Sequence, residues 1–323
     1  MKSDSAVSVV VAFVIILAVI SVIVGVWALF GIPGQLHAAG EAAVSESESA
    51  FTDYKIKLEA LQNSDTRMVN LSVLMPMGGA ASSGTLRVEK AGGLGVINAT
   101  ESLSSDYLTG GAKLIEIHRL VSDVGLRGTQ VGFEANGIFR NDNGMASWSV
   151  PLNLTLWNDT GEKPGGQLYV RLNAATITGS LDVGGTGSIP LNTYYTGDNV
   201  TVNTTNRTQS LVYATENEWD ANLWYSQFYE ALEEFKAGNK FPANTTAEIS
   251  RSSLSGLHLV WMNITTLNGG EEMHTLEVHT PVYNAQAVEG YIVVAPAYHI
   301  IQASAGDNGK ISPSGSVRVR EGS

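Results

Sequence analysis

The chain of 323 residues contains no cysteine. Disulfide bonds, thiolate metal sites and cysteine nucleophiles are therefore excluded. A domain without disulfides must be stabilised by the size of its hydrophobic core, and a chain of this length can bury a large one.

Positive charge is also scarce. The chain has 19 Lys and Arg against 31 Asp and Glu, which gives a formal net charge of -12, and the basic residues form no run. Binding to nucleic acid or to an anionic lipid surface requires clustered Lys and Arg. The composition therefore argues against both kinds of partner.

Motifs of the common catalytic and cofactor sites are missing as well. The chain has no G-x-S-x-G elbow and no lysine after a phosphate-binding glycine loop. In the segment HTLEVH, a strand would place His274 on one face and Glu277 and His279 on the other. Three ligands from this segment cannot then converge on one metal ion. We expect no catalytic residue, no cofactor and no metal site, and hence no enzyme.

A long apolar run is the clearest positive feature. Residues 6–30, AVSVVVAFVIILAVISVIVGVWALF, carry neither charge nor proline. As a helix this run would be about 35–40 Å long, enough to cross a bilayer. It is too long for the apolar part of a cleaved secretory peptide. The sequence therefore predicts a membrane-spanning helix.

A second helix is expected directly after this run. Ile32, Pro33 and Gly34 interrupt the apolar helix, and a helical pattern then continues to residue 64. Its stripe recurs every three or four residues at Leu36, Ala39, Ala43, Ser47, Phe51, Tyr54, Leu58 and Leu61. Such a helix packs against its own domain, against copies of itself, or against both at different ends.

The N-terminal segment DSAVSVVVAFVIILAVISVIVGV resembles that of archaeal type IV pilin-like proteins. The following stretch, GIPGQLHAAGEAAVSESESAFTDYKIKLEAL, is similar to that of pilin-like ectodomain proteins. This resemblance implies a leader, residues 1–6, that a prepilin-peptidase-like enzyme removes between Ala6 and Val7. Residues 7–32 would be held in the membrane before assembly and would then form the core of a helical filament by self-association. Residues 33–64 would extend the helix.

Residues 65–301 are predicted to form a β-rich ectodomain, because short segments alternate apolar and polar residues. Two Asn-Gly pairs, Asn136-Gly137 and Asn143-Gly144, predict tight turns. Thr215 and Glu218 predict a capping box before one amphipathic helix, which Gly238 ends. The expected fold class is α+β, with a long N-terminal hydrophobic helix, a mainly antiparallel, sandwich-like ectodomain and this one amphipathic helix. Residues 302–323 resemble the start of a β-repeat module of secreted proteins.

The chain contains about twice as many N-glycosylation sequons as its composition would give. The asparagines of these sequons are Asn70, Asn98, Asn153, Asn158, Asn199, Asn203, Asn206, Asn244 and Asn263. Because an exported surface protein meets the glycosylation machinery, we expect glycans at some of them.

These features indicate a structural subunit of an archaeal filament at the cell surface, first a single-pass membrane precursor and then part of an extracellular polymer. Two alternatives stay open at this point. One is a surface glycoprotein, adhesin or minor pilin that keeps the helix as a permanent anchor. The other is a membrane-tethered glycan hydrolase, which would hide its carboxylates in the β domain.

Overall fold

The computed structural model describes residues 4–27, 32–62, 68–75, 84–98, 114–124, 128–159, 166–185, 187–238, 241–254, 256–267 and 270–288. This part of the chain holds three helices, α1 (Asp4–Val26), α2 (Ile32–Gln62) and α4 (Glu218–Gly238). The strands are β1 (Met68–Met75), β2 (Gly84–Asn98), β3 (Ile115–Val124), β4 (Thr129–Glu134), β5 (Gly137–Asp142), β6 (Met145–Val150), β7 (Asn153–Asp159), β8 (Gln167–Asn173), β9 (Thr176–Thr178), β10 (Asp182–Gly185), β11 (Gly187–Thr205), β12 (Gln209–Thr215), β13 (Thr245–Leu254), β14 (Leu257–Thr266) and β15 (Met273–Ala287).

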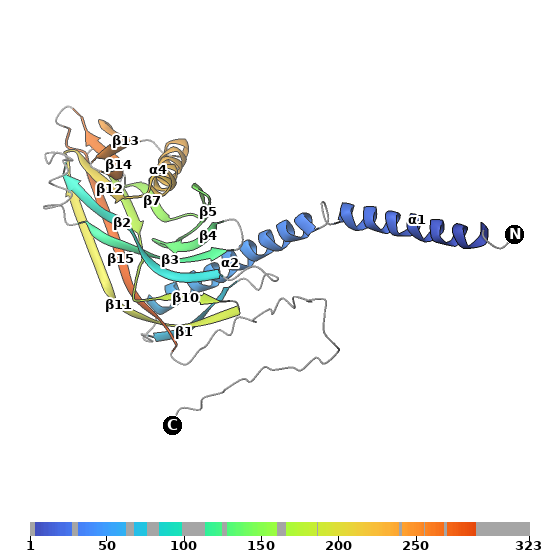
Figure 1. Ribbon diagram of the computed structural model, residues 1–323. Coiled ribbons are helices and arrows are strands. Elements are labelled where there is room, and N and C mark those ends of the chain that lie inside the picture. The colour runs from blue at the N-terminus through green and yellow to red at the C-terminus, as the bar shows by residue number, and fades with distance from the viewer. Residues whose placement is uncertain are drawn as a thin grey trace, which may run out of the picture.

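The strands form two sheets (Figure 1). The first sheet has the order β1-β11-β15-β8-β7, and β9 pairs with β15. The second has the order β13-β14-β12-β2-β3-β4-β5-β6, and β10 pairs with β2. Strand β15 runs parallel to β8 and to β9, whereas the other pairs of neighbours are antiparallel. The two sheets are thus mainly antiparallel.

The two sheets and α4 share one hydrophobic core. Leu172 and Leu276 of the first sheet, Met262 of the second and Trp224 of α4 are completely or almost completely buried in it. In α4, Trp224, Phe228 and Phe235 follow the helical spacing and lie on the buried face. The aromatic stripe of this helix therefore serves packing.

A second core lies beneath α2. The stripe of Phe51, Tyr54, Leu58 and Leu61 is at most 1% exposed, and the Tyr54 ring contacts the edge of Phe133 at 5.8 Å between centroids. From Ala43 to Leu61 this helix therefore packs against its own domain, which was one of the two interpretations of its pattern.

Both predicted Asn-Gly turns lie at hairpins, but one is displaced by a residue. Asn143 and Gly144 take the positive φ angles between β5 and β6. Between β4 and β5 the positive φ angles belong to Ala135 and Asn136, while Gly137 already begins β5. A Cβ at Gly137 would come within 2.6 Å of the Trp148 ring, so glycine is required there by packing rather than by the turn.

The predicted membrane-spanning helix is wrong for the described part of the chain. Helix α1 comprises Asp4–Val26, and residues 28–31 lie outside the described residues. Among the described residues, no helix is both long and apolar enough to cross a membrane.

The predicted α+β fold class is also wrong, because of this N-terminal helix and because strands predominate over helices. Strands hold 58% and helices 29% of the described residues, so the fold is mostly β. The longest strand, β11, has 19 residues. Residues 289–301 of the predicted ectodomain and the tail of residues 302–323 lie outside the described residues.

Replacing Leu58 with Ala should lower the free energy of unfolding by about 2–5 kcal/mol, because it leaves a cavity in the core beneath α2. The matched control is Ile56→Ala on the same helix, since Ile56 is 59% exposed. This control should change the free energy by less than about 1 kcal/mol. Urea unfolding followed by tryptophan fluorescence measures both values, and equal losses in the two variants would contradict this account of α2.

Candidate functional site

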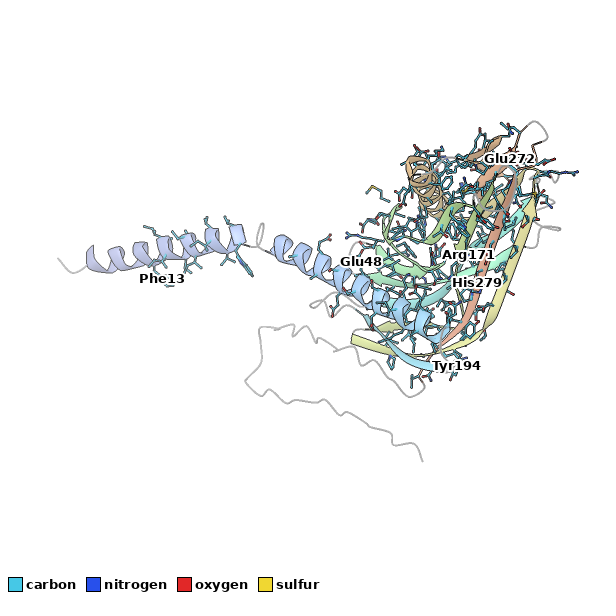
Figure 2. The ribbon with its side chains drawn as sticks, turned by 180° about the vertical axis from the view of Figure 1, so that it is seen from behind. Phe13, Glu48, Arg171, Tyr194, Glu272 and His279 are labelled. Carbon is cyan, nitrogen blue, oxygen red and sulfur yellow. The ribbon has the colours of Figure 1, made fainter. Side chains whose placement is uncertain are left out.

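Helix α1 presents an apolar surface on every side. Its large hydrophobic side chains from Phe13 to Val26 are between 47% and 65% exposed. The helix extends away from the β domain, and Phe13 is labelled near its middle in Figure 2. Covering this surface would stabilise the molecule by on the order of 10 kcal/mol, since burial of one such side chain contributes about 1.5–3 kcal/mol. The surface of α1 is thus a candidate assembly site.

Helix α2 connects this surface to the β domain through polar contacts as well as apolar ones. The Arg140 guanidinium donates to both carboxylate oxygens of Glu41 at 3.3 Å. The Ser149 hydroxyl donates to Glu48 Oε1 at 2.5 Å, and Glu48 lies on the side of α2 that meets the sheet (Figure 2). The helix is therefore held to β5 and β6 over its first half and to the core over its second half.

A buried group of charged residues lies between the second sheet and α4. The Arg119 guanidinium is 3.1 Å from Glu134 and 3.2 Å from Asp220, and both carboxylates are completely buried. The Trp224 ring nitrogen donates to Glu134 Oε1 at 2.7 Å, and the Tyr213 ring stacks on Trp224 at 4.0 Å. These five residues come from β3, β4, β12 and α4, so the network fastens the helix to the sheet.

One of the two carboxylates holds a proton. The Tyr213 hydroxyl lies 3.0 Å from Glu134 Oε1 and 2.9 Å from Asp220 Oδ2, yet it has a single hydrogen to donate. Burial and the neighbouring Glu134 raise the pKa of Asp220 well above its usual range, so the proton belongs to Asp220. The Arg119 guanidinium lies 2.8 Å from Glu89 as well, so it contacts three carboxyl groups.

The start of α4 differs from the predicted capping box. The amide of Ala221 donates to the carbonyl of Asn217 at 3.0 Å, so Asn217 is the residue that caps the helix. Thr215 instead donates from its hydroxyl to the Ala91 carbonyl at 2.9 Å and lies 3.1 Å from Asp220. The threonine thus joins the helix start to the buried network.

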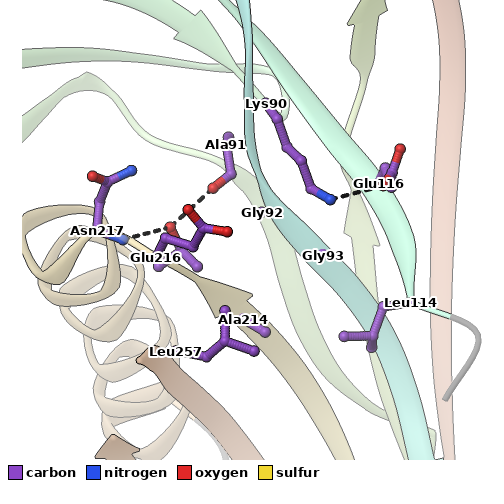
Figure 3. Close-up of a pocket in the computed structure, with 11 residues that line it drawn as sticks. Lys90, Ala91, Gly92, Gly93, Leu114, Glu116, Ala214, Glu216, Asn217 and Leu257 are labelled. Carbon is purple, nitrogen blue, oxygen red and sulfur yellow. Dashed lines mark hydrogen bonds and ion pairs between the residues drawn. The ribbon is translucent and has the colours of Figure 1, made fainter. Parts of the chain in front are cut away.

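A surface pocket of about 270 Å³ lies beside this helix start (Figure 3). A Cβ at Gly92 would come within 2.4 Å of the Ala214 carbonyl, so this wall must be bare backbone. Lys90 Nζ pairs with Glu116 at 2.7 Å, and the Asn217 amide donates to Thr215 Oγ1 at 3.2 Å (Figure 3). The Glu216 side chain also lines the pocket.

The histidines of the HTLEVH segment lie as the strand pattern predicts. His274 is completely buried, and burial lowers its pKa to about 4. His279 lies on the outer face of β15 (Figure 2), where its Nε2 is 3.3 Å from Asp198. Within the described residues, no three His, Asp or Glu side chains gather in a geometry suited to a metal ion.

The predicted processing site lies in α1, since Ala6 and Val7 both belong to this helix. The sequon asparagines are spread over the β domain. The exposed ones are Asn98, Asn153, Asn199, Asn206 and Asn244. The half-buried ones are Asn158, Asn203 and Asn263, and Asn70 lies in β1. The structure thus brings none of them to α1.

Comparison of the chain with protein families, with characterised proteins and with solved structures gives no match.

The buried network could not be recognised in the sequence. Arg119, Glu134 and Asp220 are far apart in the chain, and none belongs to a motif. The one available signal was Glu134 directly after the apolar residues Val131 to Phe133, because a charge in a strand buried on both faces needs a partner.

Replacing Asp220 with Asn should change how stability depends on pH. Because the pKa of Asp220 is raised on folding, the native state binds one proton more than the unfolded state above about pH 4, and stability falls as pH rises. The amide introduced by Asp220→Asn cannot titrate, so between pH 4 and pH 7 the variant should lose less stability, or gain more, than the wild type. Urea unfolding at several pH values measures this difference, with Glu233→Gln on the exposed face of α4 as the control. Parallel pH profiles for the wild type and Asp220→Asn would contradict the assigned proton.

Proposed function

We propose that this chain is a structural, pilin-like subunit of an extracellular filament at the archaeal cell surface and that its copies assemble through α1. The observation that carries the proposal is the uncharged surface of α1, which is about half exposed on every side from Phe13 to Val26. A helix without a polar face is stable in water only when similar helices surround it. Copies of the same helix are the simplest partner.

The arrangement of the remaining elements supports this proposal. In a bundle of α1 helices, α2 would hold each β domain on the outside of the polymer, since α2 is fixed to that domain from Glu41 to Leu61. The resemblance of the N-terminal segment to archaeal type IV pilin-like proteins points to the same assembly. The pocket and the buried network belong to the β domain, where Lys90 pairs with Glu116 and Arg119 with Glu134.

Placing charge in α1 should abolish assembly. The double variant Ile16→Lys/Ile23→Lys puts two ammonium groups into the helix bundle, where a charge without a partner costs several kcal/mol. We expect no filaments by negative-stain electron microscopy and a slowly sedimenting species, with unchanged unfolding of the β domain. The control is Met145→Lys, which changes a 79% exposed apolar side chain on β6 and should leave filaments intact. Filaments of normal length from the double variant would refute assembly through α1.

Processing of the leader provides an independent measurement. Mass spectrometry of filaments from the producing cells should find Val7 as the first residue, as the resemblance implies for a prepilin-peptidase-like enzyme. Replacing Ala6 with Asp should leave Met1 in place and prevent assembly. Filaments built from chains that begin at Met1 would contradict the proposed processing.

A further inference from the structure

The two sheets leave several strand edges open. In the described ladders, β1 and β7 end the first sheet, and β13 and β6 end the second. Among the described residues, strand β11 also has an open side, because β1 pairs only with residues 187–194 and β15 is the one strand that pairs with the rest. Unpaired amide and carbonyl groups on such edges recruit strands of other molecules unless something prevents it.

The open half of β11 has little protection of its own. Val200 and Val202 are 55% and 57% exposed, and residues 197–205 contain no proline, lysine or arginine. The charge in this stretch is that of Asp198, which is paired with His279. Proteins commonly guard an edge of this kind with charged side chains or proline. Here those devices are missing.

Sequons are found at the edges that charged side chains or proline would otherwise protect. Seven of the nine sequon asparagines lie on an edge strand or directly beside one: Asn70 in β1, Asn153 and Asn158 in β7, Asn199 and Asn203 in the open half of β11, Asn206 just after it, and Asn244 just before β13. Of the other two, Asn263 belongs to β14 and has a paired neighbour on both sides, whereas Asn98 ends β2, where the ladder with β12 reaches it but the ladder with β3 stops at Leu94.

We propose that N-linked glycans on the edge sequons shield the sheet edges and prevent the β domains from pairing edge to edge. This inference rests on the proposed function, because only an exported chain meets the glycosylation machinery. Asn199 and Asn203 are about 13 Å apart along the strand at 3.3 Å per residue. A strand of another molecule would have to approach β11 within about 5 Å to form hydrogen bonds. A hydrated glycan on these asparagines occupies that space and excludes the approaching strand.

The chemistry of attachment is compatible with the contacts of these side chains. The amide Nδ2 of asparagine attacks the anomeric carbon of an oligosaccharide activated as a lipid-linked phosphate. A C–N bond forms, the C–O bond to the phosphate breaks, the lipid phosphate leaves, and the amide gives up one proton. One N–H remains on Nδ2, so the Asn203 bond to Asn98 Oδ1 at 2.7 Å and the Asn244 bond to Glu272 at 2.9 Å can persist.

The test begins with glycopeptide mass spectrometry of the protein from its producing cells. Glycans should be present at Asn199 and Asn206, the exposed pair at the open half of β11. The double variant Asn199→Gln/Asn206→Gln is made in a chain that also carries Asn203→Gln, so that none of the three sequons at this edge remains. The matched control, Thr265→Ala, removes the sequon of Asn263 on an interior strand but keeps the Asn263 side chain. All chains are full length and are kept dispersed in a mild non-ionic detergent that covers α1.

We expect the double variant to form larger species by light scattering, while the control stays as dispersed as the wild type. Amide exchange in residues 199–205 should slow at least about tenfold in the double variant, because the edge amides become hydrogen-bonded. Adding Val202→Lys should reverse both effects, since a charge on the edge prevents pairing while Val202 is exposed and free to change.

Unmodified Asn199 and Asn206 in the native protein would overturn the inference. So would a double variant as dispersed as the control, or association that Val202→Lys does not reverse. Failure of the proposed function has a different signature, namely the absence of filaments from the wild-type chain whatever its glycans. The same set of proteins therefore distinguishes failure of the glycan inference from failure of the proposed function.

Discussion

The burial of α2 against both sheets is the interaction on which the rest of the molecule depends. The Tyr283 hydroxyl of β15 donates to the Leu58 carbonyl at 3.0 Å, and the Tyr54 hydroxyl lies 3.3 Å from Thr193 of β11. Both tyrosines are at most 1% exposed, so these bonds are protected from water. A helix held by apolar packing and by directed polar bonds cannot turn about its axis. Any force on the N-terminal part of the chain therefore reaches the two longest strands of the first sheet.

The buried charges at α4 have a different role. Replacing a buried ion pair with apolar residues is often neutral or stabilising, so Arg119, Glu134 and Asp220 add little to net stability. Their geometry is restrictive, however, because the Arg119 guanidinium must meet Glu89, Glu134 and Asp220 while it lies 4.6 Å from the centre of the Trp219 ring. We infer that this network fixes the position of α4 on the sheet, whereas the aromatic stripe of the helix supplies the free energy.

Local patterns predicted the helix α2, the helix α4 and most strands, because each of these elements has one buried face that imposes a period on its sequence. Strand β11 escaped prediction for the opposite reason. Its residues from Thr196 to Thr205 are at least partly exposed on both faces, so no alternation of apolar and polar residues is required there, and Pro190 and Gly197 suggest a loop. The apolar α1 surface was visible as a run of residues in the sequence. The Arg119 network was invisible because only the fold unites its members.

The lack of cysteine and the open strand edges are connected through assembly. Without disulfides, the β domain depends on its two cores, and transient opening of an edge strand is not limited by a covalent link. In a filament built on α1, neighbouring β domains would be tethered at effective concentrations of millimolar order. Edge-to-edge pairing that is negligible for a dilute monomer would then compete with the ordered lattice. A polymer of this architecture therefore needs guarded edges more than a monomer does, and the concentration of sequons on edge strands is the form of protection that its sequence offers.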